Sequence, residues 1–316
     1  MNSNTLPTLP TELIFSIFSW LSPIEALKLR TLCKRIQTCL KTSHFALLVT
    51  ARFLHGTDTD FLISNKSFDQ LFFKFPEPYS RLAAEHLCVV MARHSYIQLR
   101  WDDLTLANVA LPPAVKYLTY FWYLQISKTE LTGCLPVELF GLVKLKVLDL
   151  SDNKITGPLP NEVGQLVNLE CLCLRRNQMN GPIPESIGEL KQLVQLVLND
   201  NEFTTLPQSI GELSKLEALH LSCNNIGGRL PSTLGRLQSL VFLLLNNNLF
   251  EGEIPVEIAR LESLRFGDFS SNKLSGLIPN EFVDLIQLEA LDLRGNSLWR
   301  DPTLTNVDID WRHVLL

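Results

Sequence analysis

The sequence has few of the features that mark nucleic-acid-binding or membrane-spanning proteins. Its 316 residues carry 28 Lys and Arg against 33 Asp and Glu, a net charge of −5, and the basic residues are scattered along the chain. A nucleic-acid partner would need a basic patch or stripe, so this distribution argues against one. The longest uninterrupted apolar stretches, such as residues 240–245, are far below membrane length. We therefore expect neither nucleic acid nor a membrane as partner.

Catalytic and metal-binding patterns are also missing from the sequence. None of the six histidines lies in a metal-ligand or nucleophile motif. We therefore expect no catalytic residue, no metal and no cofactor, and we predict that the protein is not an enzyme.

Cysteines and targeting signals bear on the compartment. The cysteine count is seven, an odd number, which favours a reducing compartment, the cytoplasm or the nucleus. Residues 13–21 are apolar enough for the core of a signal peptide. The residues before them contain no Lys or Arg but include Pro7, Pro10 and Glu12, which are the wrong flank for secretion.

What the sequence does contain is a long internal repeat. Seven asparagines follow one another at spacings of 24, 24, 23, 24, 24 and 24 residues: Asn153, Asn177, Asn201, Asn224, Asn248, Asn272 and Asn296. Each lies in the same frame, as in LKVLDLSDNKITGPLP (145–160) and LECLCLRRNQMNGPIP (169–184). A fixed period of this length predicts a solenoid of stacked coils.

Each coil can be interpreted from its residue types. In the LxxLxL part, alternate side chains point to opposite sides of a short strand, so the leucines face inward. The asparagine amide has both donor and acceptor atoms and can bond backbone groups from coil to coil. An eighth coil precedes these seven, with Thr129 in the asparagine slot, where we expect its hydroxyl to replace the amide in part. The half-repeat after each Pro should return the chain through a helical or 3₁₀ turn on the convex side.

The pattern resembles the plant-type leucine-rich repeat, LxxLxLxxNxLxGxIPxxLGxLxx, over residues 118–299. The resemblance implies an α/β solenoid of about eight coils with short parallel strands on the concave face. The coil from Asn201 departs from it by losing the Gly-x-Ile step and one residue. Residues 97–117 and the tail, 300–316 with Trp311, are the candidate lids over the two ends. Paired cysteine caps, common in secreted repeats of this type, are missing.

A second motif lies in residues 1–50. Residues 11–21 should form a helix that is apolar nearly all round, which one neighbouring face cannot bury. Ser22 to Glu25 form a capping box that begins a second helix. The stretch LPTELIFSIFSWLSPIEALKLRTLCKR resembles an all-α, three-helix F-box. The resemblance implies docking onto the acidic adaptor of cullin-RING ubiquitin ligases, through Leu9, Pro10, Leu13, Ile17, Leu21 and Leu29.

Residues 51–117 show no repeat and are predicted to be a helical linker and N-terminal cap, with an amphipathic helix over residues 76–94. An alternative for residues 6–50 is a helical bundle that only caps the N-terminal end of the repeat.

The concave face is the surface most free to bind a partner, because its side chains are not needed in the core. Two outward columns place Phe242, Leu244 and Phe266 together as an exposed apolar patch, flanked by Asp268 and Asp292. Such aromatics are typical anchors of an interface. Contact with residues 51–117 or with the tail would explain them too. Two further candidates for binding acid or phosphate, at a strand end, are Arg175 and Arg176.

These features predict a non-catalytic, substrate-recognition subunit of a cullin-RING (SCF-type) ubiquitin ligase. The F-box would dock the adaptor, and the repeat arc would hold a client protein. A first alternative is an intracellular scaffold or signalling protein whose F-box-like module caps the solenoid. A second is a secreted receptor-like ectodomain, which predicts cleavage near residue 26 and a glycan at the sequon Asn65-Lys66-Ser67.

Overall fold

The computed structural model describes residues 81, 84, 88, 98–101, 106, 108–300 and 314–315. The predicted F-box, with all six of its adaptor-docking positions, lies outside the described residues, as does Trp311. Arg81, Ala84 and Cys88, within the predicted helix over residues 76–94, are helical.

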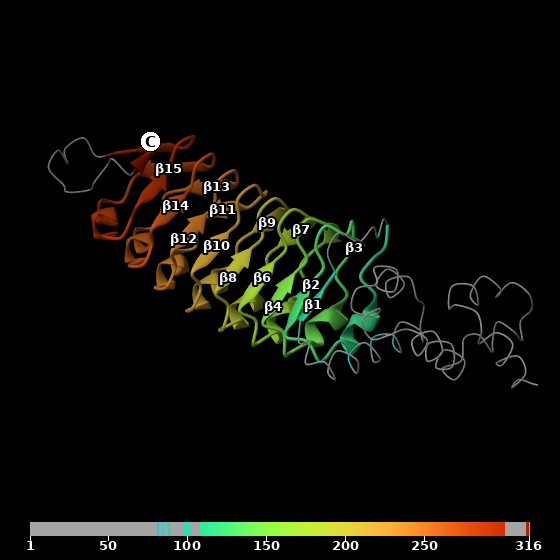
Figure 1. The fold of residues 1–316 in the computed structure, drawn as a ribbon. Helices are drawn as coiled ribbons and strands as arrows, with labels where there is room; N and C mark the ends of the chain where they lie inside the picture. Colours follow the sequence, from blue (N-terminus) through green and yellow to red (C-terminus); the bar gives the residue numbers. More distant parts are fainter. Residues whose placement is uncertain are drawn as a thin grey trace, which may run out of the picture.

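A ten-stranded parallel sheet runs along the solenoid (Figure 1). Neighbouring strands pair in register, so that Leu124, Leu148 and Leu172 form one inward column. We call the outward side of this sheet the concave face. Its strands in spatial order are β1 (Gln98–Arg100), β2 (Tyr123–Gln125), β4 (Val147–Asp149), β6 (Cys171–Cys173), β8 (Gln195–Val197), β10 (Ala218–His220), β12 (Phe242–Leu244), β14 (Phe266–Asp268), β16 (Ala290–Asp292) and β18 (Val314–Leu315).

A second set of strands forms two separate four-stranded parallel sheets. The first contains β3 (Thr132–Gly133), β5 (Lys154–Gly157), β7 (Gln178–Pro182) and β9 (Glu202–Thr205). The other contains β11 (Gly227–Arg229), β13 (Leu249–Gly252), β15 (Lys273–Leu277) and β17 (Ser297–Trp299). The interruption lies between β9 and β11, at the coil that the sequence shows to be one residue short.

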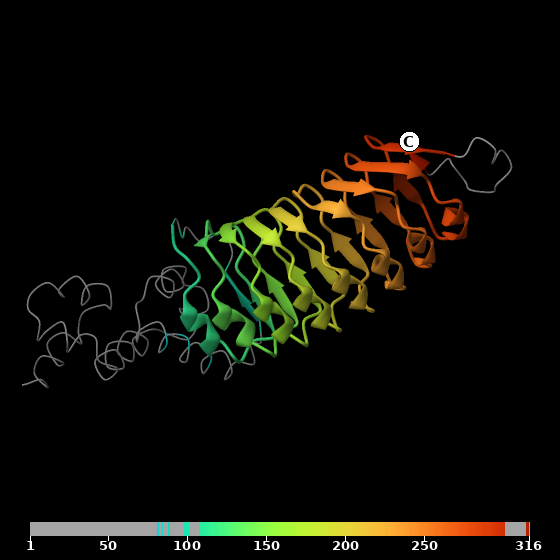
Figure 2. The same cartoon turned by 180° about the vertical axis from the view of Figure 1, so that it is seen from behind.

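The convex side consists of 3₁₀ turns, which confirms the predicted return segment. Each begins directly after a proline, whose fixed φ suits the entry to a turn. Figure 2 shows these turns stacked in a row along the solenoid. They are η2 (Pro113–Tyr117), η3 (Val137–Gly141), η4 (Asn161–Gln165), η5 (Glu185–Glu189), η6 (Gln208–Glu212), η7 (Ser232–Arg236), η8 (Val256–Arg260) and η9 (Asn280–Asp284).

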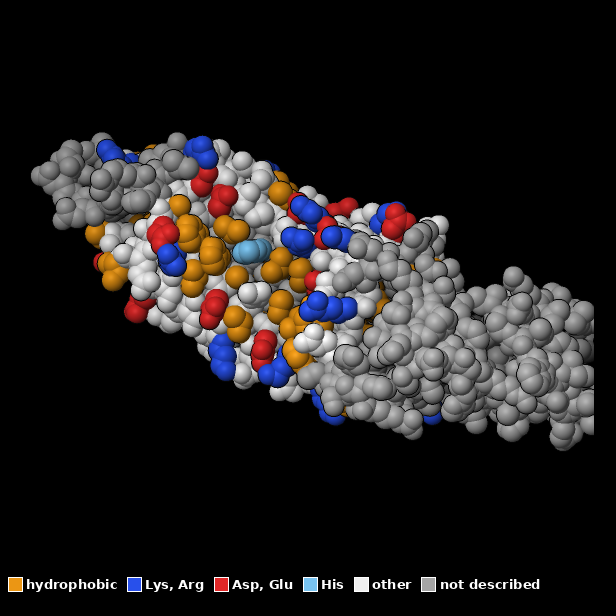
Figure 3. Space-filling model, viewed as in Figure 1, with side chains coloured by type: hydrophobic (Ala, Val, Ile, Leu, Met, Phe, Trp, Pro, Cys, Tyr) orange, Lys and Arg blue, Asp and Glu red, His pale blue; other side chains and the backbone are white. Residues whose placement is uncertain are grey.

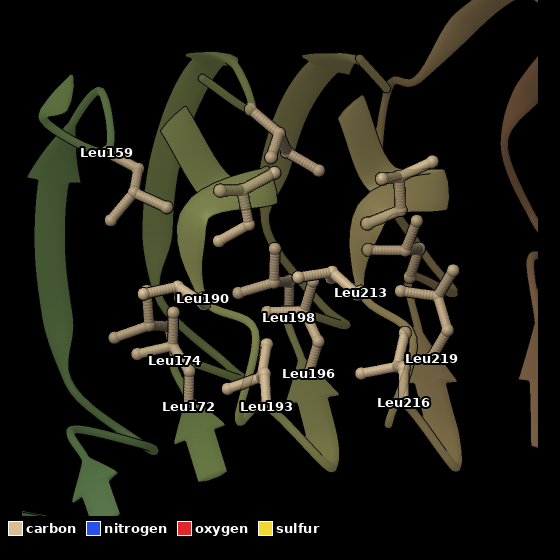
Figure 4. Close-up of a cluster of buried hydrophobic side chains, with 14 of the residues drawn as sticks. Leu159, Leu172, Leu174, Leu190, Leu193, Leu196, Leu198, Leu213, Leu216 and Leu219 are labelled. Carbon is tan, nitrogen blue, oxygen red and sulfur yellow. The ribbon is translucent and has the colours of Figure 1, made fainter. Parts of the chain in front are cut away.

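The inward leucines of successive coils form one continuous apolar core. Leu172, Leu196 and Leu219, from three neighbouring strands, have no exposed surface and lie side by side in Figure 4. Burial of a leucine side chain contributes about 1.5–3 kcal/mol, and a single coil has no second layer against which to bury it. The stack is therefore the unit of stability.

The asparagine ladder bonds backbone groups in two coils, as predicted. Asn224 is typical: its Nδ2 donates to the carbonyls of Leu198 in the preceding coil and Leu221 in its own, both at 3.0 Å. Its Oδ1 accepts the N–H of Phe203 at 3.0 Å. The amide therefore satisfies buried polar groups that have no strand partner.

Thr129 behaves differently from our expectation that its hydroxyl partly replaces an asparagine amide. The hydroxyl donates forward, to Asn153 Oδ1 at 2.8 Å, and that oxygen also accepts the N–H groups of Thr129 and Leu131. A hydroxyl on a short side chain cannot span to both coils, so the following asparagine takes the additional bond.

The residue before each ladder asparagine has a left-handed backbone. The conformation recurs because the turn after the strand must reverse direction between two buried positions. At seven coils a non-glycine residue carries the positive φ, between 52° and 58°, and at the last coil a glycine does: Lys128, Asp152, Arg176, Asp200, Cys223, Asn247, Ser271 and Gly295.

Both predicted end regions contribute strands to the sheet. We predicted residues 97–117 as a lid outside the repeat, but β1 and η2 make a further coil there. Trp101 occupies the inward slot that Ile126 fills in the next coil, and it is 2% exposed. At the other end, β18 from the tail pairs in parallel with β16.

Candidate binding surface

Two outward columns of the concave face lie as the sequence predicted. Register pairs Ala218, Phe242, Phe266 and Ala290 in one column. The same pairings place His220, Leu244, Asp268 and Asp292 in the other. Side chains about 24 positions apart in the sequence become neighbours because the strand occupies the same position in every coil.

The aromatic residues form a stacked cluster at β10, β12 and β14. The rings of Phe242 and Phe266 lie parallel, at 7°, with centroids 5.1 Å apart. His220 meets Phe242 edge-on at 6.3 Å. Phe242 is 39% exposed, while Leu244 and Phe266 are half-buried. Figure 3 shows hydrophobic side chains gathered over β12 and β14. We call Phe242, Leu244, Phe266 and His220 the aromatic patch.

His220 gives the patch a buried polar atom that has no hydrogen-bond partner in the part of the chain that the structure describes. Burial lowers the pKa of the imidazole from its ordinary value of 6.5, which favours the neutral ring at neutral pH. Its Nε2 is buried and has no hydrogen-bond partner among the described residues. A neutral ring edge against Phe242 is compatible with an apolar contact surface.

Two of the charges near the patch are neutralised by arginines. Arg294 donates to Asp292 through Nε at 3.0 Å, and this bond lowers the pKa of the Asp292 carboxyl. Arg265 is paired with Glu289 and also lies over the Phe266 ring, 5.7 Å from its centroid. The predicted flank at Asp292 is thus an ion pair rather than a free carboxylate.

Two other carboxylates beside the patch have no ion pair among the described residues. Asp268 accepts the N–H and the hydroxyl of Ser270, at 3.0 and 2.6 Å. Glu217 is exposed and directly precedes β10. Sequence reasoning missed Glu217 because we considered only the columns within the strands. The residue directly before each main strand forms a further outward column, and including that column would have identified Glu217.

Arg175 and Arg176 lie apart from the aromatic patch. Both are paired with Asp152, at 3.4 and 3.3 Å, and Arg176 also approaches Asp200 at 3.9 Å. Three strand steps separate β6 from β12, about 14 Å at the usual strand spacing. The two arginines therefore belong to a separate, charge-balanced turn.

Cys171 and Cys173 point outward from β6 near Asp149. Burial, with a smaller contribution from the Asp149 charge, raises the pKa of Cys171 to about 11 and that of Cys173 to about 12. Both are therefore protonated thiols at neutral pH, and thiols in this form are weak metal ligands and weak nucleophiles. Within the described residues no group of three His, Cys, Asp or Glu side chains is arranged to hold a metal.

A hollow lies beside the four-stranded sheet of β11, β13, β15 and β17, in the C-terminal half of the solenoid. Its volume is about 1050 Å³, and polar side chains dominate its lining: Gln208, Arg229, Ser232, Glu253, Asn280 and Glu281. It is formed by β11, β13 and β15 and the starts of η7 to η9, on a different side from the aromatic patch.

In the part of the chain that is described, no helix is both long and apolar enough to cross a membrane.

Family models match both parts of the chain. A leucine-rich repeat region matches residues 184–296, and a Leucine Rich Repeat model matches 144–166 and 168–190. The chain is therefore a leucine-rich-repeat protein. An F-box domain model matches residues 6–47. The matched domains thus combine an F-box with leucine-rich repeats in one chain, an arrangement consistent with an F-box and leucine-rich-repeat protein. The comparison with curated proteins finds no match.

Solved structures similar to the chain include plant receptor ectodomains. The LRR ectodomain of the Arabidopsis thaliana membrane receptor kinase GASSHO1/SCHENGEN3, in complex with CASPARIAN STRIP INTEGRITY FACTOR 2, is 36% identical with a TM-score of 0.59. The match covers 60% of this chain and 23% of that one. The Arabidopsis receptor kinase HAESA, in complex with the peptide hormone IDA and a co-receptor, is 30% identical with a TM-score of 0.59, covering 69% and 35%.

A plant ice-binding protein is 26% identical with a TM-score of 0.53, and the match covers 64% of this chain and 66% of that chain. This chain thus spans about a quarter to a third of the two receptor structures and about two thirds of the ice-binding protein. Two of these proteins are described as receptor kinases and one as an ice-binding protein, although all three are similar to this solenoid. The fold alone therefore does not specify a function.

Proposed function

We propose that this protein is a substrate-recognition subunit of an SCF-type cullin-RING ubiquitin ligase, acting in the cytoplasm or the nucleus. The F-box would bind the Skp1-type adaptor, and the concave face would hold a client protein for ubiquitin transfer by the other subunits. The observation that carries the proposal is the pairing of an F-box match at residues 6–47 with a repeat solenoid that presents an open aromatic patch.

The patch supports the client-binding half of the proposal. Phe242 has 39% of its surface exposed although the chain has a continuous core in which to bury aromatics. Stacked aromatics on a rigid sheet lose little side-chain freedom on binding, which makes them effective anchors. The receptor kinase HAESA, whose repeat structure is similar to this solenoid, is described in complex with a peptide hormone, which supports a recognition role for this architecture.

The adaptor half is tested by replacing Leu9 and Pro10 together with alanine in the full chain. We expect adaptor recovery to be lost in a pulldown, because the change removes apolar contacts from the start of the F-box. The thermal unfolding of the repeat domain should stay unchanged. Adaptor recovery equal to that of the wild type would refute the ligase role and favour a scaffold whose N-terminal module caps the solenoid.

A matched variant in the repeat domain serves as control. Phe242→Ala with Leu244→Ala should keep the adaptor and lose clients in affinity purification with mass spectrometry. The Leu9 and Pro10 variant should lose the adaptor and keep clients. Co-loss of adaptor and clients in both variants would indicate general misfolding rather than two separate binding surfaces.

A further inference from the structure

The charges around the aromatic patch identify what kind of segment it fits. Six charged residues lie on, or within two positions of, the paired strands β10, β12, β14 and β16: Glu217, Asp268, Asp292, Glu289, Arg265 and Arg294. Four acids against two bases leave a net charge of −2. Arg294 pairs with Asp292 and Arg265 with Glu289, so the negative charge resides on Glu217 and Asp268.

The two carboxylates lie on opposite sides of the aromatic pair. Glu217 precedes β10, while Asp268 ends β14, two strands away. Figure 3 shows acidic side chains on two sides of the gathered hydrophobic ones. Two strand steps and three residues along the strand separate the Cα atoms of Glu217 and Asp268 by about 14 Å. We therefore assign a separate cationic side chain to each carboxylate.

An extended peptide matches this diagonal. It advances about 3.3 Å per residue, so about four residues span 14 Å, and side chains at alternate positions point to the same side. The middle of three such side chains would lie over Phe242 and Phe266. Apolar contact would then supply affinity, and the two carboxylates would select the flanking side chains.

We propose that the aromatic patch recognises an extended segment of a partner protein with a basic residue, an apolar residue two positions later, and a basic residue two positions after that. This inference rests on the proposed function only in treating the concave face as a client site. The favourable contacts are two carboxylate–cation pairs around one aromatic anchor. An acidic or phosphorylated segment meets repulsion at both Glu217 and Asp268.

The test uses the full chain and fluorescently labelled synthetic peptides of twelve residues. The first carries Lys-Ser-Phe-Ser-Lys at its centre, the second Glu-Ser-Phe-Ser-Glu, and the third has the lysines moved next to the phenylalanine. We expect the first peptide to bind at least about tenfold more tightly than the other two, and its affinity to fall with added salt. Equal affinity for the basic and acidic peptides, or no binding of any peptide at about 1 mM, overturns the proposal.

Variants assign the effect to named residues. Glu217→Gln and Asp268→Asn should each weaken the basic peptide about threefold, and Glu217→Lys with Asp268→Lys should reverse the preference in favour of the acidic peptide. Phe242→Ala should weaken both peptides. Arg175→Ala, three strands away, should change neither. A charge-reversed, folded variant that still prefers the basic peptide also overturns the proposal.

The outcome is separate from that of the adaptor experiment. A chain that binds the adaptor but shows no preference for the basic peptide keeps its ligase role and loses this inference. A chain that prefers the basic peptide but recovers no adaptor keeps the recognition surface and loses the ligase role.

Discussion

The coil that contains β8 and Asn201 is one residue shorter than the preceding coil, which contains β6 and Asn177, and the second set of strands is interrupted after the shorter coil. In the regular coil, β7 pairs with β5 on one side and β9 on the other. In the short coil, β9 has no strand partner in β11, although the N–H of Asn225 donates to the carbonyl of Phe203 at 2.9 Å. The main sheet continues through both coils without interruption.

The comparison shows which parts of a coil depend on its length. A strand that loses one residue changes the phase of its N–H and C=O groups, so ladder pairing fails on that side. The main strand and the ladder asparagine lie before the missing residue, and their offsets from the coil start are unchanged. The inward leucines and the asparagine therefore hold the stack together. The second set of strands pairs only where the length of the coil keeps its backbone groups in phase.

The largest expected effect is at the ladder asparagine that follows the short coil. Asn224→Ala removes the partners of Phe203 N–H and of the Leu198 and Leu221 carbonyls, all in the interior. We expect a loss of about 3 kcal/mol of unfolding free energy, because several buried polar groups are left without partners. Chemical denaturation measures it.

Thr129→Ala is the control for that variant. It removes one donor to Asn153 Oδ1, which keeps two N–H donors, so we expect about 1 kcal/mol. A loss at Thr129 as large as the loss at Asn224 would contradict the view that the amide supports two coils.

The next effect tests whether the convex turns differ between short and regular coils. A Cβ on Gly211 in the short coil would lie 2.3 Å from the carbonyl oxygen of Thr233, and one on Gly235 would lie 2.2 Å from that of Glu257. We expect Gly211→Ala and Gly235→Ala to cost about 2 kcal/mol each, because backbone must move to relieve either clash. Thermal unfolding measures both.

Gly141 supplies the matched control, because a Cβ there meets nothing within 4 Å. Gly141→Ala should leave stability within about 0.5 kcal/mol of the wild type. If Gly211→Ala proves harmless while Gly235→Ala is costly, the short coil also packs loosely on its convex side, and the missing residue affects more than the second set of strands.

A third variant restores the missing residue. Replacing Thr204-Thr205 with Asn-Gly-Pro gives the short coil the sequence of its regular neighbour at Asn180-Gly181-Pro182. We expect β9 and β11 to pair, with a gain of about 1 kcal/mol from new backbone hydrogen bonds. Hydrogen exchange should slow at the amides of Gly227–Arg229. Unchanged exchange there would show that the interruption has another cause.

The smallest expected effect concerns the left-handed position in the coil that follows the short one, directly before Asn224. Cys223 has a φ of 57°, and asparagine tolerates this region better than cysteine does. Cys223→Asn should therefore gain about 0.5 kcal/mol of stability. Cys134→Asn, at an exposed cysteine without a positive φ, should gain nothing measurable. Equal gains would indicate a general benefit of removing thiols.

The repeat itself could be predicted from the sequence because its signal is periodic. Residues in the same slot of successive coils necessarily share one column, so the position of Phe242 beside Phe266 followed from counting. The coil at 98–117 was missed as a coil because Trp101 replaces the branched aliphatic residue that marks this slot in the next coil. A pattern defined by leucines cannot detect a tryptophan that fills the same space.

By itself the sequence determined which side chains face the core, which face the concave side, and which coil is one residue short, since each follows from a position within a period. Only the tertiary structure decided which charges are free. Asp292 and Asp268 occupy the same slot, yet Arg294 bonds the first while Ser270 bonds the second. That outcome depends on the reach and rotamer of each side chain between stacked coils, which spacing along the chain does not specify.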